Sequence, residues 1–155
     1  MKPVDLTKHF KKELFIPNMQ AQTKEQALEE LLDMFVAEKL VKNKHIVLEM
    51  LTQRETMGST GIGKGTAVPH GRTTATADVI IAFGRSEQGI EFNAIDNKPV
   101  HLFFMVIAPP SDEGNVYLPI LGSLVTILKD DSKRKSLNNV NSFDELLEVI
   151  QGDRQ

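Results

Sequence analysis

The chain of 155 residues contains no cysteine, and its longest apolar run covers only residues 102–108. The absence of cysteine excludes disulfide bonds and thiolate metal sites, and it is compatible with a reducing cytosol. The apolar run is far shorter than the roughly 20 residues of a membrane-spanning helix. The N-terminus also lacks the apolar segment of a signal peptide. We therefore expect a cytoplasmic protein that does not insert into a membrane.

An excess of charge is lacking as well, because the formal net charge is only −3. This balance gives no electrostatic case for binding nucleic acid or an anionic membrane. Hydrophobic residues make up 41% of the chain and charged residues 25%, which is typical of a globular protein. A chain of this length corresponds to one compact domain, so we predict a single domain over residues 1–155.

Apolar residues recur at helical spacing in four segments. Two of these segments begin with a capping box, in which Thr or Ser is followed three residues later by Gln or Glu. The first helix is expected to end near Leu40, and Pro119 lies in the first turn of the third helix, where proline is tolerated. The expected helices begin at Thr23, Asn43, Tyr117 and Ser142.

Four segments have the composition of strands, and the last of them is apolar on both faces, which is typical of a central strand. Together with the helices they predict one α/β domain in which helices cover a mixed sheet. The expected strands cover residues 65–70, 78–84, 89–92 and 99–110.

The glycine-rich stretch GIGKGTAVPHGR, residues 61–72, comes close to a nucleotide-binding loop. Position 65 is glycine where that loop has a hydroxyl group for magnesium, and Pro69 blocks the helix that must follow. The spacing G-x-G-x-G also differs from the dinucleotide-binding pattern. We therefore expect no nucleotide cofactor and no metal. The glycines fit a tight crossing of backbone between a helix and a strand.

His70 lies between Pro69 and Gly71 in this stretch. Pro69 biases Val68 to an extended conformation, which places His70 at the end of a strand. An imidazole that is neutral near pH 7 can act as a nucleophile, and Gly71 would let backbone N–H groups approach a phosphoryl group there. Taken alone, the stretch fits either a phosphoryl acceptor or an ordinary, partly buried histidine.

Arg54 extends the apolar stripe of the second helix, since it follows Val47 by seven residues and Met50 by four. It should therefore point toward the body of the protein from the last turn of the helix. A cation there is favourable at a helix C-terminus. A guanidinium group is also well suited to binding phosphate, and the sequence leaves both interpretations open.

The remaining polar residues fit structural roles. His101 alternates with apolar residues on the last strand, while His45 and His9 are expected to be solvated. Asp96 lies in a turn, where its carboxylate can cap backbone N–H groups.

The segments RETMGSTGIGKGTAVPHGR and GIEFNAIDNKPVHLFFMVIAP resemble the enzyme IIA domains of the bacterial phosphoenolpyruvate:sugar phosphotransferase system. The resemblance is to the fructose–mannitol class of these domains, which includes the nitrogen-regulatory IIA proteins. It spans nearly the whole chain. It implies a mixed, mostly parallel sheet flanked by helices on both faces, without metal or cofactor. It also implies transfer of a phosphoryl group from phospho-HPr to a histidine and then to enzyme IIB. In the regulatory branch, the phosphorylation state controls partner proteins.

Residue by residue, the resemblance implies that His70 is the phosphoryl acceptor and that Arg54 binds the phosphate. Tyr117 stands where many members have a second histidine. It fits either a residue that binds the phosphoryl group, through its hydroxyl and the start of its helix, or one that only packs its ring on neighbouring helices. Lys64 is unusual at a position that is often polar and uncharged or acidic in relatives. It fits either a solvated loop lysine or a lysine drawn toward phosphate.

Overall fold

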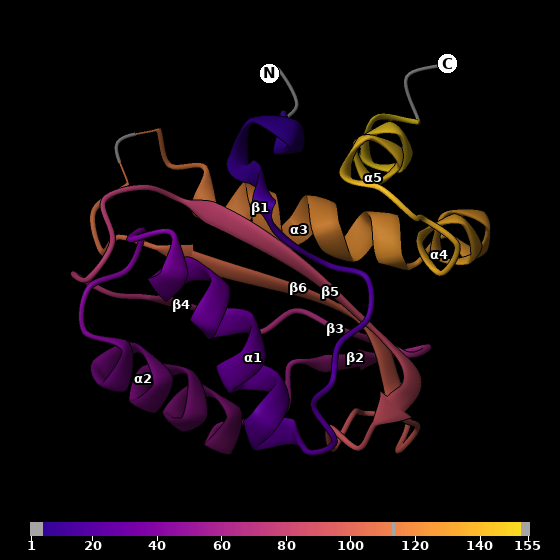
Figure 1. Cartoon of the computed structure of the whole chain (residues 1–155), viewed down its shortest axis with the longest axis horizontal. Helices are drawn as coiled ribbons and strands as arrows, with labels where there is room; N and C mark the ends of the chain where they lie inside the picture. The colour runs from indigo at the N-terminus through magenta and orange to yellow at the C-terminus, as the bar shows by residue number, and fades with distance from the viewer. Residues whose placement is uncertain (1–4, 113, 153–155) are drawn as a thin grey trace.

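The computed structural model describes residues 5–112 and 114–152, so the expected domain ends at residues 1 and 155 lie outside the described residues. Within these residues, the strands form one open sheet that is covered by helices on both faces (Figure 1). The strands are β1 (Phe10–Ile16), β2 (Gly61–Gly63), β3 (Thr66–Ala67), β4 (His70–Arg72), β5 (Ile80–Ile90) and β6 (Val100–Ala108). A 3₁₀ helix (Leu6–His9) precedes β1, and the α-helices are α1 (Lys24–Ala37), α2 (Lys44–Thr56), α3 (Tyr117–Leu128), α4 (Asp131–Leu137) and α5 (Phe143–Gln151).

Strand β6 lies inside the sheet, as its apolar sequence predicts. The strand order is β1-β5-β6-β3-β2, and β4 pairs with β6 further along the same edge as β3. The pairings of β1 with β5, β3 with β6 and β4 with β6 are parallel, while those of β2 with β3 and β5 with β6 are antiparallel. The expected mixed sheet with mostly parallel pairings is therefore confirmed.

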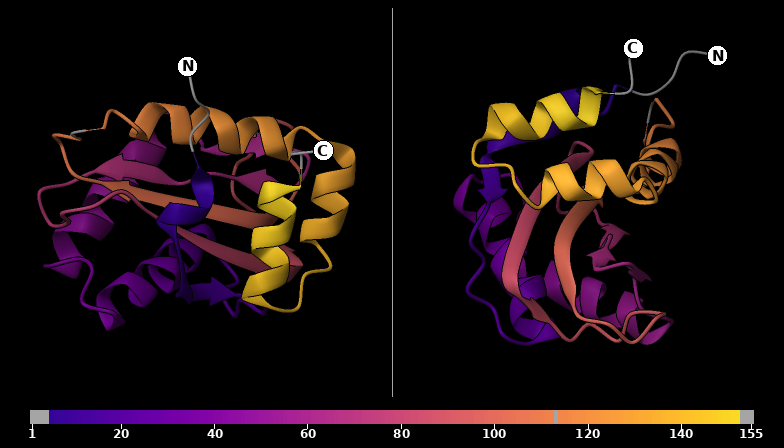
Figure 2. Two further views of the ribbon diagram at one scale, coloured as in Figure 1. Left: turned by 90° about the horizontal axis from the view of Figure 1, so that it is seen from above. Right: turned by 90° about the vertical axis from the view of Figure 1, so that its right-hand side faces the viewer.

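Each face of the sheet has its own hydrophobic core. Helices α1 and α2 cover one face, and α3, α4 and α5 gather on the other, as both views of Figure 2 show. Neighbouring residues of β6 point to opposite faces, so Phe103 packs in the core beneath α1 and α2 and Phe104 in the core beneath α3. Both side chains are fully buried. The packed faces hold β4 between the end of α2 and the start of α3.

The expected strands have different limits in the structure. The expected strands at 78–84 and 89–92 are parts of one strand, β5, which begins at Ile80 and ends at Ile90 and whose pairing shifts register between Arg85 and Ile90. Gly89 has a φ of +87° at this irregularity, a conformation that glycine adopts without strain. Residues 65–70 are divided into β3 and the start of β4 because Pro69 has no N–H for the ladder. The register on β6 is nevertheless the same on both sides of Pro69.

The helix starts agree with the sequence, and the differences lie in weakly patterned segments. The side chains of Thr23, Asn43 and Ser142 each accept a backbone N–H at the start of their helices. Helix α1 ends at Ala37, earlier than the expected end near Leu40, and Ile46 on α2 is 55% exposed. Sequence analysis missed β1, β2 and α4, which are short or strongly charged. Among the described residues, no helix has the length and apolar character needed to cross a membrane.

Candidate functional site

His70 opens β4 at the edge of the sheet, where its ring is partly buried. The Nδ1 atom lies 2.7 Å from the carbonyl oxygen of Val68. A carbonyl oxygen only accepts hydrogen bonds, so Nδ1 must carry the hydrogen. The neutral ring then keeps its lone pair on Nε2, which is the atom available for bonding to an electrophile.

The surroundings of His70 favour its neutral form. Burial lowers the pKa of His70 below its usual value, and the positive charge of Arg54 lowers it further. The hydrogen bond to Val68 and the carboxylate of Glu55 act in the opposite direction but do not reverse the shift. His70 is therefore uncharged at neutral pH.

Arg54 lies in the last turn of α2, close enough for its charge to act on both His70 and Tyr117. Its Nη1 atom donates a hydrogen bond to the carbonyl oxygen of Gly58, at 2.8 Å. This bond directs the guanidinium group over the loop that follows α2 and uses one of its five N–H donors. The structure thus brings Arg54 to the same site as His70, as expected.

Glu55 anchors the loop that follows α2, a role that was not predicted from the sequence. Its carboxylate accepts hydrogen bonds from the backbone N–H (3.1 Å) and the hydroxyl of Thr60, and it pairs with Lys24 at 3.0 Å. Both charged side chains are largely buried, with 6% of Glu55 and 12% of Lys24 exposed. In the sequence, the signal for this role was an acidic residue directly after Arg54. The Glu55 side chain anchors the loop through Thr60 and Lys24.

Tyr117 is the first residue of α3, and its ring centroid lies 6.3 Å from that of His70. The side chain is 5% exposed, and burial raises the pKa of its hydroxyl, which keeps the phenol neutral. The backbone N–H of Tyr117 donates to the Asp112 carboxylate at 2.7 Å. The proximity to His70 is as expected, but Asp112 already occupies the first N–H at the helix start.

Gly71 has a packing reason to be glycine. A Cβ atom at this position would lie 2.0 Å from Sδ of Met50 on α2, far inside van der Waals contact. The glycine therefore lets α2 pack directly on β4. Its expected part in binding phosphate remains a prediction.

Arg72 also belongs to this site and was not identified from the sequence. Its guanidinium carbon lies 4.6 Å from the centroid of the Tyr117 ring, and its Nη1 donates to the carbonyl oxygen of Pro110 at 2.9 Å. The signal was its position two residues after His70, which in a strand means the same face.

Lys64 and Asp96 lie in the turns near β2 and β3. Lys64 is exposed with a φ of +56°, and its ammonium lies 4.0 Å from Asp131 on α4, in agreement with a solvated loop lysine. Asp96 accepts the backbone N–H groups of Lys64 (2.9 Å) and Lys98 (3.1 Å), which confirms the expected capping role. These bonds lower the pKa of Asp96.

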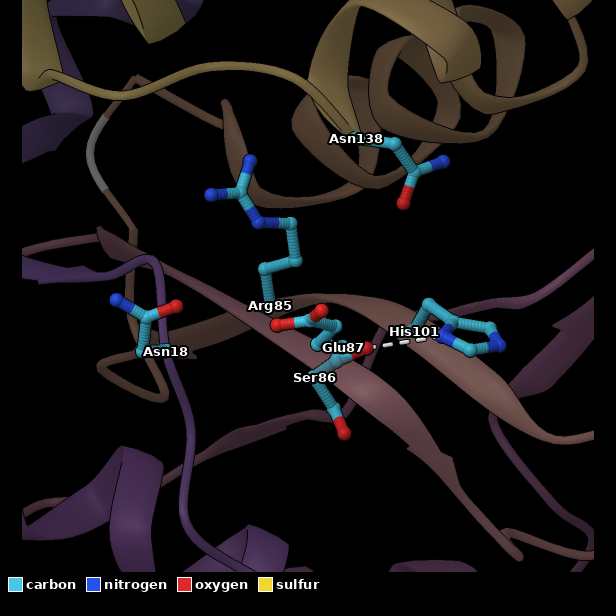
Figure 3. A pocket seen from close by; sticks show the side chains of 6 residues that line it. All are labelled: Asn18, Arg85, Ser86, Glu87, His101 and Asn138. Atoms are coloured by element: carbon cyan, nitrogen blue, oxygen red, sulfur yellow. Dashed lines mark hydrogen bonds between the residues drawn. The ribbon is translucent and has the colours of Figure 1, made fainter.

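The other histidines lie outside the site. His45 is exposed, as expected, whereas His9 is partly buried and its Nδ1 lies 3.0 Å from the Val79 carbonyl oxygen. His101 lines a separate pocket of about 240 Å³ together with Arg85 and Asn138 (Figure 3). Its Nδ1 lies 2.8 Å from the Ser86 carbonyl oxygen. Along β6 this pocket is five residues, about 16 Å, from the residue that pairs with His70.

Comparison with known proteins gives the site its context. Residues 8–152 match the family described as "Phosphoenolpyruvate-dependent sugar phosphotransferase system, EIIA 2". The chain therefore belongs to this family, whose members are phosphotransferase components that carry phosphoryl groups between proteins.

Relatives from two functional groups are similar to the chain. It is 37% identical over 128 residues to a fructose-specific EIIA component of Haloferax volcanii, covering 83% of this chain and 82% of that protein. It is 38% identical over 130 residues to a nitrogen regulatory protein of Klebsiella oxytoca, covering 83% and 79%. It is also 34% identical to a fructose-specific EIIABC component of Bacillus subtilis, with 94% of this chain covered but only 22% of that longer protein.

Solved structures have the same fold. Nitrogen regulatory protein IIA-Ntr of Neisseria meningitidis matches with a TM-score of 0.86 and 30% identity, covering 94% of this chain and 98% of that one. The mannitol IIA enzyme of Escherichia coli, in its complex with phosphorylated enzyme IIB, matches with a TM-score of 0.75 and 25% identity, covering 92% and 99%.

Proposed function

We propose that this chain is a histidine phosphocarrier, in which His70 accepts a phosphoryl group from phospho-HPr and passes it to an enzyme IIB partner in the cytoplasm. The observation that carries this proposal is the state of His70. Its Nδ1–H is held by the Val68 carbonyl, its ring is kept neutral, and its Nε2 lone pair is left for reaction. The family and the solved complex of a mannitol IIA enzyme with phosphorylated IIB support the same chemistry.

The transfer step needs no added base, and its bonds, electron pairs and protons are all accounted for. The Nε2 lone pair of His70 forms a bond to phosphorus while the N–P bond of the donor phosphohistidine breaks, and that electron pair stays on the donor imidazole. The hydrogen on Nδ1 of His70 remains in place, so the phosphorylated ring carries positive charge. The Val68 carbonyl, which accepts this Nδ1–H, stabilises that charge as it develops.

The new phosphoryl group brings negative charge to the site, and Arg54 is the residue we propose to bind it. Its guanidinium has four further N–H donors beyond the one that reaches Gly58. The anchored Glu55 holds the end of α2, so Arg54 needs little rearrangement to meet the phosphoryl oxygens.

The test is incubation of the purified chain with phosphoenolpyruvate, enzyme I and HPr, followed by intact mass spectrometry. We expect one acid-labile phosphoryl group on the parent and none on His70→Ala. His101→Ala is a matched control, because His101 is also partly buried and its Nδ1 is also held by a backbone carbonyl. Phosphorylation of His70→Ala to the parent level would refute the proposal.

A regulatory role is the second candidate, in which the phosphorylation state of His70 controls a partner protein. The observation that favours it is the TM-score of 0.86 to IIA-Ntr, compared with 0.73 and 0.75 for two structures of the mannitol IIA of Escherichia coli. The two candidates differ in the fate of the phosphoryl group. Rapid transfer from the phosphorylated chain to purified fructose-class or mannitol-class IIB domains supports the carrier, and retention on His70 with all of them supports the regulator.

A further inference from the structure

The side of β4 that faces α3 carries two functional groups in a row. His70 and Arg72 pair with Val106 and Ala108 of β6, both of which belong to the core beneath α3. Gly71, between them, pairs with Ile107, which belongs to the core on the α2 side. Since side chains alternate along a strand, Arg72 emerges on the same face as His70.

The ring of Tyr117 lies against both of these residues. His70 contacts it at a centroid separation of 6.3 Å, with the ring planes tilted by 58°. The guanidinium carbon of Arg72 lies 4.6 Å from the same centroid, which is the geometry of a cation–π contact. Because Tyr117 is only 5% exposed, its ring is a fixed support for the arginine.

One hydrogen bond directs the guanidinium group on this support. Nη1 of Arg72 donates to the Pro110 carbonyl oxygen at 2.9 Å, just after the end of β6. The contact with the ring and this bond orient the group, and they leave four of its five N–H donors for other partners. An oriented guanidinium edge is suited to the paired oxygens of a phosphoryl group.

The charge of Arg72 acts on a group of the site, the Tyr117 hydroxyl. It acts on Tyr117 in the same direction as the charge of Arg54, and both lower the pKa of the phenol against the effect of burial. Tyr117 thus lies within the field of two arginines that come from different elements, α2 and β4.

We propose that Arg72 is a second phosphate-binding residue, whose guanidinium, supported by the Tyr117 ring, donates hydrogen bonds to the phosphoryl group on His70. The ligand is the phosphohistidine dianion, held between the guanidinium groups of Arg54 and Arg72. In this arrangement the pair of Arg72 and Tyr117 supplies the cationic group that a second histidine would otherwise provide. The inference rests on His70 as the acceptor, but not on HPr as the donor.

The first experiment uses no protein donor. The chain is phosphorylated with phosphoramidate, and the phosphohistidine is titrated by ³¹P NMR, with His70→Ala as the check on the labelled position. A nearby positive charge favours the dianion, so the titration midpoint should move to higher pH in Arg72→Ala and only slightly in Arg72→Lys. Arg134→Ala is the matched control, because Arg134 also donates Nη1 to a backbone carbonyl but lies on α4.

The second experiment measures phosphoryl transfer from phospho-HPr. Arg72→Ala should slow the transfer about tenfold, while Arg134→Ala retains the parent rate in protein that melts as a folded domain. If Arg72→Ala does not fold, Arg72→Gln keeps a donor for the Pro110 carbonyl without the charge and replaces it in both experiments.

The outcomes separate this inference from the proposed function. A moved NMR midpoint without any phosphorylation by HPr would support Arg72 and refute HPr as donor. If the folded Arg72 variant has the parent titration midpoint and the parent transfer rate, the role of Arg72 is overturned while the proposed function is unaffected. Failure of both phosphoramidate and phospho-HPr to label His70 would overturn both proposals.

Discussion

Replacing Gly71 with alanine distinguishes two reasons for the glycine beside His70. The added Cβ would lie 2.0 Å from Sδ and 2.8 Å from Cε of Met50, so the thioether must move away. Overpacking of this kind costs about 1–3 kcal/mol. Gly71 does not have a positive φ, so alanine also gains about 0.4–1 kcal/mol from the restricted unfolded chain.

Taken at the middle of their ranges, the two effects leave a net loss of roughly 1.3 kcal/mol in the free energy of unfolding. For a chain of this size, each kcal/mol lowers the melting temperature by about 2–4 °C. We therefore expect calorimetry to show a melting temperature lower by several degrees, together with slower phosphorylation of His70 as β4 and α2 are pushed apart.

The double variant Met50→Ala/Gly71→Ala tests this reasoning. If the glycine serves packing, removing the thioether restores the space, and the two substitutions together cost less than the sum of their separate effects. Phosphorylation should then return to the rate of Met50→Ala alone. An unchanged melting temperature in Gly71→Ala would refute the packing argument. Recovered stability with persistently slow phosphorylation would instead show that the phosphoryl group needs the bare backbone at Gly71.

Three further predictions concern the chemistry of the site. Arg54→Ala should slow phosphoryl transfer about 10- to 100-fold, because a charge-assisted hydrogen bond contributes roughly 1.5–3 kcal/mol. Arg54→Lys should recover only part of the rate. A parent rate in the folded Arg54→Ala protein would contradict the assignment of Arg54 to phosphate binding. Tyr117→Phe should slow transfer several-fold with nearly the parent melting temperature, and identical rates at every pH would leave Tyr117 with a packing role only. The third concerns pH: since the pKa of His70 lies below 6.5 in the folded chain, its phosphorylation by phosphoramidate should stay fast down to about pH 6.5 and decline only at lower pH. The unfolded chain binds this proton more readily, so the contribution of His70 to stability is present above pH 6.5 and lost as the pH falls; a melting temperature that declines equally in His70→Ala would contradict this linkage.

Local signals in the sequence were sufficient for the features that neighbouring residues determine. The caps at Thr23, Asn43 and Ser142 each act on residues within one helical turn, and all three helices begin there. Pro69 likewise constrains its immediate neighbours, but the strand boundary was wrong, because His70 begins β4 whereas it was expected to end a strand. The buried strand β6 was recognisable because every residue faces a core or the rim of one.

Features that depend on distant contacts were not accessible in the same way. Arg72 meets Tyr117 only because β4 pairs with β6 and the chain then returns as α3. Strand β1 escaped detection because only Phe10 and Leu14 of its seven residues are buried. The position of Tyr117 near His70 was expected from the family resemblance alone, since no pattern within the sequence links the two residues.

Strands β3 and β4 pair with β6 in the same register. The face to which His70 points therefore depends on whether the number of residues between these strands is odd or even. Ala67 pairs with Phe103 and His70 with Val106, so equal numbers of residues separate the partners on both strands. Inserting one residue between Ala67 and His70, with the β6 pairing kept, would turn the imidazole toward Met50 and α2. Inserting two would restore its direction but displace it by about 6.6 Å along the sheet, to the register position that Arg72 now holds. Within this fold, the proposed phosphoryl-transfer site therefore depends on the length of the Val68–Pro69 segment as much as on the histidine that follows it.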